Sequence, residues 1–479
     1  MNGLYSRLVE YSASDYYGFH MPGHKRQAPG GIRLPYEIDI TEIEGFDDLH
    51  HASGILKEAQ RLAAKVYGAE ESRYLVNGST AGILSAILGS TCKGERILAA
   101  RHCHKSVYHA IYLNELKPVY LYPEFGASLH MNMDISVSAV RTALMACPDI
   151  RAVVIVSPTF EGVISDIKGI ADAVHEYGIP LIVDEAHGSH LGFHPYFGTN
   201  ALAGGADVVI HSVHKTLPSL TQTALLHVQG EIADRRRIFR YLDMLQSSSP
   251  SYILMASIDN CVRMLDGQGR ELFEDYVERL RKLRKMLGML KCLKLVETEN
   301  YDCSKLVISV NGVGMTGKEL YRMLLERYHL QMEMAAGTYV VAMTSVSDSQ
   351  EGFDRLQNAL FEIDAELEEG RTAGAGRGER NRDVGAAGLP VQEQVMTCAE
   401  AIGISDGESG TEELVWQSAE ARISAEYAYL YPPGIPLIVP GERISPETIS
   451  LLLQYQAAGF LIEGTEKAGQ IRVLRIQRE

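Results

Sequence analysis

Short apolar runs alternate with amphipathic segments between about residues 55 and 230. The runs at 152–156, 181–183 and 206–210 are apolar almost throughout, and this pattern predicts strands that are buried on both faces. Segment 170–177 places its apolar residues at helical spacing and predicts a helix between two of these strands. Alternation of strands and helices predicts an α/β fold with a mainly parallel sheet, in which ligands bind at the carboxyl ends of the strands.

The pattern changes in the second half of the chain. Charged helical segments at 271–287 and 354–369, with an apolar strand at 305–310, predict a smaller α+β lobe. Residues 370–388 are rich in glycine, alanine and arginine, a composition typical of a flexible linker. We therefore predict five segments: an N-terminal arm (1–50), a large α/β domain (51–255), a small α+β domain (256–369), a linker (370–390) and a C-terminal module (391–479).

Composition limits the classes of protein to which the chain can belong. A length of 479 residues exceeds one ordinary core and predicts two or three domains. The net charge of −16, from 45 basic and 61 acidic residues, argues against nucleic-acid binding. No apolar run approaches the roughly 20 residues that span a bilayer, and the N-terminus lacks a signal-peptide pattern. We expect a cytoplasmic protein with no membrane or nucleic-acid partner.

Charged side chains follow two of the predicted strands at their carboxyl ends. Asp184 comes directly after the run 181–183, and Lys215 follows the run 206–210 within the sequence His-Ser-Val-His-Lys-Thr. A partly buried lysine is costly unless its ammonium is paired or neutralised, and one use for it is a Schiff base with an aldehyde. Pyridoxal 5′-phosphate (PLP) needs such a lysine and a carboxylate for its pyridine nitrogen. Asp184 and Lys215 therefore predict a PLP site.

A strand–turn–helix unit at 74–82 predicts a phosphate-binding turn. Gly78 permits close approach of the backbone, Ser79 and Thr80 carry hydroxyls, and the start of a helix presents N–H groups to an anion. An ordinary helix cap has the same appearance, so the turn alone does not decide between the two interpretations. Further donors to a phosphate, in the sequence beside the predicted lysine, are Ser212 and His214; the alternative for His214 is a core histidine.

Two histidines follow the predicted strand 96–100. His104 is our candidate for an imidazole that stacks on the cofactor ring. Metal binding by His102 and His104 is the competing interpretation, but no third ligand stands at a usable spacing. We therefore expect no metal.

Taken together, these motifs resemble the Orn/Lys/Arg decarboxylase family of fold-type I PLP enzymes, in the short form without an N-terminal wing domain. The resemblance extends nearly from end to end of the chain. The matching segments are 19–25, 39–42, 47–50, 77–80, 157–162, 184–188, 212–215, 431–436 and 440–442. It implies an aminotransferase-like large domain, a smaller lobe and a C-terminal decarboxylase module.

The resemblance also implies roles for single residues. Lys215 would bind the cofactor aldehyde, Asp184 would keep the pyridine nitrogen protonated, and His104 and Ala186 would lie against opposite ring faces. The remaining implied roles are phosphate binding by Ser79, Thr80, Ser212 and His214, phosphate binding in a partner subunit by Ser248, and contact with the ring oxygen or substrate by His187 and Thr159. The distal cation of the substrate needs an acidic partner, and Glu442 is our candidate; the alternative for Glu442 is a surface carboxylate after a turn.

The expected activity is PLP-dependent decarboxylation of a basic amino acid, with arginine favoured over lysine or ornithine, in a homodimer or larger homo-oligomer with shared active sites. An aminotransferase or a carbon–carbon lyase on the same fold is the first alternative, and a non-catalytic regulatory relative is the second. Cys303 and Ala336 stand where relatives commonly carry proline and aspartate, so the identity of the substrate is open.

Overall fold

The computed structural model divides into two compact units, and each has its own set of strands. The first unit comprises Met1–Thr91 and Ile167–Asp275, and the second comprises Cys92–Asp166 and Tyr276–Glu479. Most of the predicted motif at 19–25, most of the linker and residues 431–433 lie outside the described residues. The structure describes residues 3–14, 21–22, 34–372, 388–407, 410–430 and 434–475.

Four strands of the first unit follow one another in the order β1 (Glu71–Leu75), β9 (Ala224–Val228), β8 (Val208–His211) and β7 (Leu181–Asp184). Strands β7 and β8 are parallel, whereas β9 is antiparallel to both β8 and β1. Every residue of β7, β8 and β9 is buried, as their continuous apolar runs predict. The predicted strands at 181–183 and 206–210 are confirmed within one or two residues.

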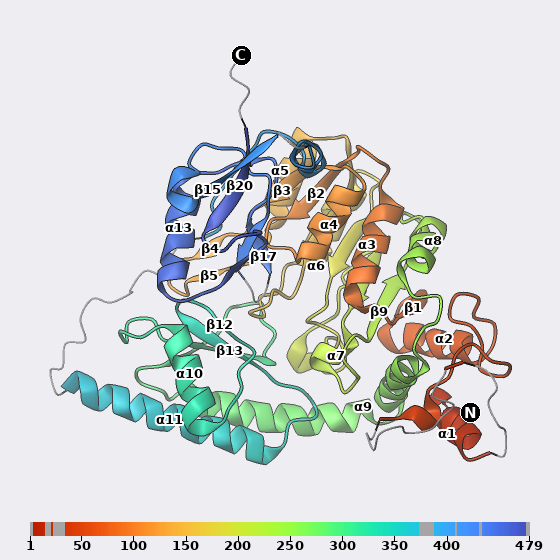
Figure 1. Ribbon diagram of the computed structural model, residues 1–479. Coiled ribbons are helices and arrows are strands. Elements are labelled where there is room, and N and C mark those ends of the chain that lie inside the picture. Colours follow the sequence, from red (N-terminus) through yellow and green to blue (C-terminus); the bar gives the residue numbers. More distant parts are fainter. Residues whose placement is uncertain are drawn as a thin grey trace. The chain divides into compact units, whose positions relative to one another are not determined.

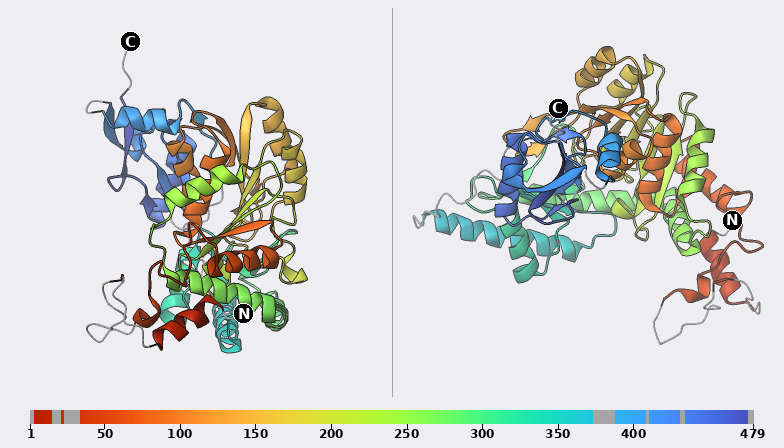
Figure 2. Two further views of the ribbon diagram at one scale, coloured as in Figure 1. Left: turned by 90° about the vertical axis from the view of Figure 1, so that its right-hand side faces the viewer. Right: turned by 45° about the horizontal axis from the view of Figure 1, so that its top comes forward.

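Helices cover these strands. Helix α3 lies beside α8 (Figure 1). The N-terminal helices α1 and α2 lie near the first half of α9 (Figure 2). The backbone N–H of Leu4, at the start of α1, donates to the carboxylate of Asp259 on α9. The helical elements that begin in this unit are α1 (Leu4–Ser12), η2 (Tyr36–Ile38), α2 (Ile55–Tyr67), α3 (Gly78–Ser90), α6 (Ile167–His175), η3 (Pro195–Phe197), α7 (Val213–Thr216), α8 (Arg235–Leu245) and α9 (Tyr252–Leu287).

The second unit contains the parallel strands β6 (Ile150–Val156), β2 (Arg96–Ala100) and β3 (Lys117–Leu121). Together with β7 and β8, these pairs confirm the predicted α/β class with mainly parallel strand pairing. Further elements of this region are α4 (Lys105–Leu113), β4 (Phe125–Gly126), β5 (Met131–Asn132) and α5 (Val137–Ala146).

An antiparallel sheet forms the core of the predicted α+β lobe. Its order is β10 (Lys294–Val296), β11 (Lys305–Ser309), β13 (Tyr339–Met343) and β12 (Met334–Ala335). Two further helices belong to this lobe, α10 (Gly317–Tyr328) and α11 (Gln350–Thr372). Helix α10 begins with a capping box, in which Thr316 and Glu319 satisfy each other's backbone N–H groups.

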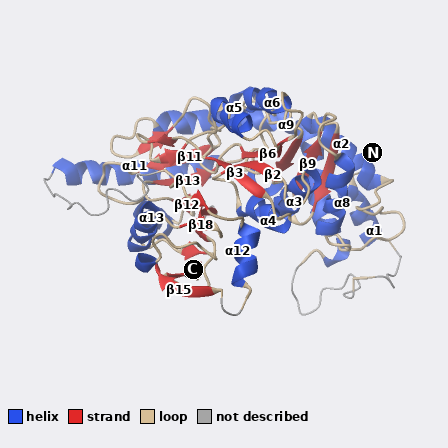
Figure 3. Cartoon of the chain, turned by 90° about the horizontal axis from the view of Figure 1, so that it is seen from above, coloured by secondary structure: helices blue, strands red, loops and turns tan. Residues whose placement is uncertain are grey.

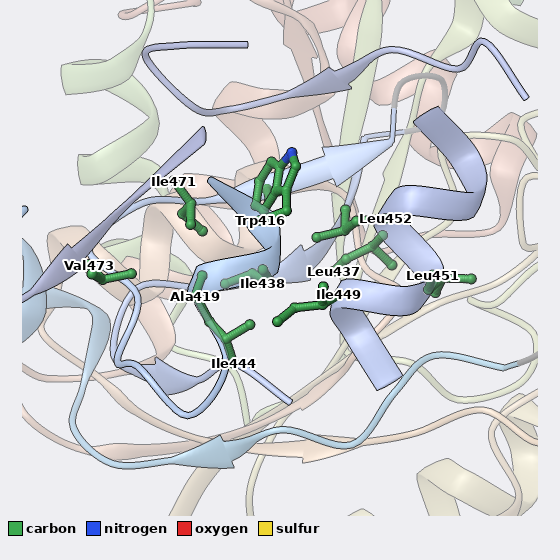
Figure 4. Packing of buried hydrophobic residues seen from close by; sticks show 11 residues of the cluster. Trp416, Ala419, Leu437, Ile438, Ile444, Ile449, Leu451, Leu452, Ile471 and Val473 are labelled. Carbon is green, nitrogen blue, oxygen red and sulfur yellow. The ribbon is translucent and has the colours of Figure 1, made fainter. Parts of the chain in front are cut away.

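The C-terminal module has its own apolar core around Trp416, which is 1 % exposed (Figure 4). The core consists of eleven buried residues, among them Leu437 and Leu452. Helix α12 lies beside α4 of the same unit (Figure 3). The elements of the module are β14 (Glu393–Gln394), α12 (Cys398–Ser405), β15 (Thr411–Val415), η4 (Trp416–Ser418), β16 (Ala428–Leu430), β17 (Ile435–Ile438), β18 (Glu442–Arg443), α13 (Pro446–Ala457), β19 (Ile462–Glu463) and β20 (Gln470–Leu474).

Candidate active site

The predicted carboxylate and lysine lie in the same unit, at the carboxyl ends of two paired parallel strands. Asp184 is the last residue of β7 and pairs in register with Ile210 of β8, and Lys215 lies on the short helix α7 that follows β8. Asp184 is 3 % exposed and Lys215 is half-buried. Burial raises the pKa of Asp184, and the positive charge of Lys215 partly offsets that effect. The two charges are therefore close enough to interact, as the PLP interpretation requires.

His187 contacts the lysine directly. Its Nε2 lies 3.0 Å from Nζ of Lys215, and the side chain is 7 % exposed. The turn after β7 also holds the carboxylate, because the backbone N–H of Ala186 donates to Oδ1 of Asp184 at 3.1 Å. Of the predicted site residues in this turn, His187 contacts Lys215, Asp184 interacts with its charge, and Ala186 bonds Asp184.

The predicted phosphate-binding turn brings together hydroxyls from two elements. Oγ of Ser79, on the first turn of α3, lies 2.6 Å from Oγ of Ser212, which precedes α7. Gly78 has a φ of 71°, which favours glycine, and its N–H donates to the carbonyl of Gln222. The side chain of Asn77, the N-cap residue of α3, makes no capping hydrogen bond. The backbone N–H groups of the first turn can therefore donate to another acceptor. Hydroxyls beside an uncapped helix start fit a phosphate group.

The structure gives less direct support to the other two predicted phosphate ligands in this unit. His214 donates from Nδ1 to the carbonyl of Thr223 at 2.8 Å, which leaves Nε2 as an acceptor in the neutral ring. Burial and the charge of Lys215 lower the pKa of His214, which favours the neutral ring. Nε2 could donate to a phosphate only in the protonated ring, so the negative charge of the phosphate would have to raise this pKa again. Thr80 is exposed on the first turn of α3. Both roles stay predictions.

The remaining candidates have defined local contacts. His104, in the second unit, is the N-cap of α4 and accepts from the backbone N–H of Ser106. Thr159 is buried in the same unit, and its Oγ1 accepts from the N–H of Val163 at 3.2 Å. Ser248, in the first unit, is exposed. The predicted roles of these three residues toward the cofactor are not tested by these contacts.

Glu442 is occupied by a partner that the sequence did not predict. Its Oε2 lies 3.2 Å from Nη2 of Arg101, and the two side chains are 2 % and 1 % exposed. Glu442 also accepts from the N–H of Val439, while Arg101 donates to Tyr108 and to the carbonyl of Pro436. Burial raises the pKa of Glu442, and Arg101 opposes this shift. The pair therefore ties the C-terminal module to the end of β2, and substrate binding by Glu442 stays a prediction.

Removing either member of this pair is expected to destabilise the protein strongly. Glu442→Gln or Arg101→Met leaves one charge buried without its counterion, which typically costs about 3–5 kcal/mol. Thermal unfolding of both variants and of the double variant measures the coupling. Asp172→Asn, which removes an exposed partner of Lys168, is the matched control and is expected to melt like the parent protein. Equal melting temperatures for Glu442→Gln and the control would contradict this role.

Comparison with known proteins identifies the chain. The profile of the Orn/Lys/Arg decarboxylase major domain matches residues 2–341, and the profile of the C-terminal domain of the same family matches residues 385–464. The chain belongs to the Orn/Lys/Arg decarboxylase family. This family assignment confirms the resemblance inferred from the motifs, and with it the predicted class of PLP-dependent decarboxylases that act on basic amino acids.

Curated relatives of the family align over the whole chain. The arginine decarboxylase of Bacillus subtilis (strain 168) is 32% identical over 99% of this chain and 98% of its own length. The arginine decarboxylase of Bacillus anthracis is 30% identical over 99% of this chain and 97% of its own length.

Solved structures share the fold. The lysine decarboxylase LdcF of Francisella novicida superposes with a TM-score of 0.83 at 19% identity, over 98% of this chain and 80% of that chain. An alanine–glyoxylate aminotransferase from Nostoc sp. superposes with a TM-score of 0.51 at 17% identity, over 64% of this chain and 86% of that chain. The predicted aminotransferase-like fold is confirmed.

Two further observations concern only the described part of the chain. None of its helices combines the length and apolar character needed to cross a membrane. None of its clusters of histidine, cysteine and acidic side chains is arranged to hold a metal ion.

Proposed function

We propose that this Orn/Lys/Arg decarboxylase acts on arginine and releases agmatine and carbon dioxide, with PLP held on Lys215. The observation that carries the proposal is the buried carboxylate of Asp184 next to Lys215, at the ends of two parallel strands. Arginine is favoured because the relatives that align over nearly the whole chain at 30–32% identity are named arginine decarboxylases.

The residues of the first unit would hold the cofactor at three points. Nζ of Lys215 would bind its aldehyde carbon, and the carboxylate of Asp184 would accept the hydrogen bond of its pyridine N–H. The hydroxyls of Ser79 and Ser212, with the start of α3, would bind its phosphate. When bound, PLP supplies a conjugated ring that accepts the electron pair of the breaking bond between Cα and the carboxylate.

Asp184, Lys215 and His187 can also hold and transfer the protons that the reaction requires. Asp184 is 3 % exposed, so its negative charge acts in surroundings with little water, where it favours a proton on the atom that it faces. The contact of 3.0 Å between Nζ of Lys215 and Nε2 of His187 lets either nitrogen hold the proton that the other releases. One of them would deliver a proton to Cα of the product, and a positioned acid of this kind contributes typically about 10²–10⁴-fold to the rate.

Ser79 tests the proposed phosphate site. Ser79→Ala removes a hydroxyl that would bind a charged oxygen, so the dissociation constant for PLP is expected to rise roughly tenfold. Titration of the apoprotein with PLP, followed by visible absorbance, measures this constant. Ser85→Ala is the matched control on the same helix, because the hydroxyl of Ser85 bonds the backbone of α3. An unchanged constant in Ser79→Ala would remove this residue from the site.

The finer properties of the enzyme follow from the same proposal. Polyamine synthesis in the cytoplasm is the expected setting, with a homodimer or larger homo-oligomer in which Ser248 and Glu442 act across subunits. The acidic group that recognises the guanidinium of arginine is proposed to be Glu442, which would have to serve this role in addition to its contact with Arg101.

The choice of substrate is tested by steady-state kinetics of the PLP-loaded protein with arginine, lysine and ornithine. The proposal predicts that kcat/KM for arginine exceeds the other two by at least tenfold, since a site built for one charged group rejects an analogue that leaves buried polar atoms unpaired. A higher kcat/KM for lysine or ornithine would reassign the substrate and leave the reaction class unchanged.

A further inference from the structure

The motif at 47–50, to which the proposed function gives no role, lies in the first unit against the segment that follows helix α8. Nε2 of His50 lies 2.8 Å from the backbone carbonyl oxygen of Ser247, and Nδ1 of His50 lies 3.3 Å from Oδ1 of Asp243 on the last turn of α8. A carbonyl oxygen can only accept, so Nε2 carries the hydrogen of this bond, as it does in one neutral form and in the charged form of the ring. The imidazole of His50 thus fixes the start of residues 245–249, which we call the serine segment.

The backbone around His50 is itself held by the two acidic residues of the motif. The carboxylate of Asp47 accepts from backbone N–H groups at the start of α2, that of Gly54 at 2.8 Å and that of Leu56 at 3.0 Å. Burial raises the pKa of Asp47, but its backbone N–H donors outweigh this effect and bring the pKa below its ordinary value. Oδ1 of Asp48 accepts from the N–H of His50 at 2.9 Å. His50 therefore approaches the serine segment from a loop whose backbone is fixed.

The motif also contacts the chain just beyond the serine segment. The hydroxyl of Tyr252, the first residue of α9, donates to the backbone carbonyl oxygen of Asp47. Within the serine segment, the N–H of Ser249 donates to Oγ of Ser247 at 3.2 Å. The motif therefore holds the connection between α8 and α9 at both of its ends.

A second set of bonds joins the serine segment to the strand end that leads into the proposed phosphate-binding turn. Oε1 of Gln246, which is buried, accepts from the backbone N–H of Val76 at 2.8 Å. Nδ2 of Asn77 donates to the carbonyl oxygen of Leu245 at 3.3 Å instead of capping α3. Asn77 lies two residues before Ser79, so these bonds act on the backbone that presents the hydroxyl of Ser79.

We propose that His50 is a positioning residue for the phosphate end of the cofactor, because it fixes the serine segment that holds the turn carrying Ser79. This inference rests on the proposed function, in which the hydroxyl of Ser79 binds the phosphate of PLP. Each of residues 245–247 makes one bond of the connection, two toward the turn and one toward His50. Groups that bind a ligand must be held within about 0.5 Å of their productive positions, so loosening the serine segment weakens the phosphate site.

The test is titration of the full-length apoprotein with PLP, followed by visible absorbance. The side chain of His50→Asn ends near the position of Nδ1 and is too short to donate to the carbonyl of Ser247. The side chain of His50→Gln places an amide donor near the position of Nε2. We expect the dissociation constant for PLP to rise roughly three- to tenfold in His50→Asn, the effect of one lost hydrogen bond, and to stay close to the parent value in His50→Gln.

The neighbouring histidine provides the matched control. The side chain of His51 is 84 % exposed, and its Nδ1 pairs with Oδ2 of Asp48 at 2.8 Å. His51→Asn is therefore expected to keep the parent dissociation constant. Asn77→Ala interrupts the connection at the turn, and its effect combined with that of His50→Asn is expected to be less than additive, because both changes break the same connection.

Thermal unfolding of each apoprotein shows which variants are folded. An unchanged constant in folded His50→Asn, or an equal rise in His50→Gln or His51→Asn, would overturn the inference, and so would fully additive effects of His50→Asn and Asn77→Ala. If His50→Asn yields no folded protein, Asn77→Ala decides, and a parent constant in that variant would overturn the inference. A parent protein that shows no absorbance change with PLP would overturn the proposed function instead.

Discussion

Lys215→Ala is expected to lower kcat by roughly 10³-fold or more and to remove the visible absorbance of covalently bound PLP. The reason is chemical, because no other amine replaces a lysine that binds an aldehyde carbon. In the described structure Nζ of Lys215 lies beside His187 and interacts with the charge of Asp184, and both contacts are lost with the side chain. Stopped assays of carbon dioxide release and an absorbance spectrum of the purified variant measure the two effects.

The matched control is Lys168→Ala, which removes an exposed lysine of the same unit that pairs with Asp172. It is expected to retain the parent kcat and spectrum. Contradiction would come from a Lys215→Ala variant that keeps the parent spectrum, since the cofactor would then be held by another residue.

Asp184→Asn is expected to lower kcat by about 10²–10³-fold, the usual effect of removing one group that stabilises charge in a reaction site. The amide has nearly the same shape as the carboxylate, so the backbone N–H of Ala186 still finds an acceptor. The variant therefore loses the charge and keeps the packing. Kinetics at saturating PLP separate the loss in kcat from weaker binding of the cofactor, which is also expected.

Asp266→Asn serves as the control for Asp184→Asn, because Asp266 pairs with Lys65 at an exposed position of the same unit. Its kcat and PLP affinity are expected to match the parent values. If Asp184→Asn retained the parent kcat, the carboxylate could not be the partner of the cofactor nitrogen.

Much of the fold was predictable because its signals are local. The predicted strand 96–100 coincides with β2, and the predicted strand 181–183 lies within β7. Continuous apolar runs identify such strands, and the residues that follow their carboxyl ends are candidates for a site. Asp184 and Lys215 were predicted in this way without knowledge of which strands are neighbours, and the structure places them at the ends of the paired strands β7 and β8.

Helix boundaries were predicted less well, for a physical reason. The predicted helix 271–287 is only the second half of α9, which begins at Tyr252. Gly267 and Gly269 lie inside this helix, and glycine costs about 1 kcal/mol there, so the sequence pattern resembles a break. Buried contacts of the first half, such as those of Ile258 and Val262, compensate for this weak propensity.

Two buried polar arrangements could not be read from the sequence, because each depends on pairing between distant segments. Arg101 and Glu442 meet only when the C-terminal module is in place. His211 and His227 meet through the antiparallel register of β8 and β9, in which His211 pairs with Leu225. The sequence offers one hint: His211 directly follows the apolar run 206–210, and His227 lies inside the apolar run 224–228. An unpaired polar side chain at either position would be costly.

Product analysis shows directly whether the bond broken in the substrate is the one between Cα and the carboxylate. The PLP-loaded protein is incubated with arginine labelled at the carboxyl carbon, and the released gas and the remaining compounds are measured together. Decarboxylation yields labelled carbon dioxide and agmatine in equal amounts, and this is the expected result. A 2-oxo acid that retains the label, with no agmatine, would instead indicate a transamination on the same fold and rule out the proposed reaction.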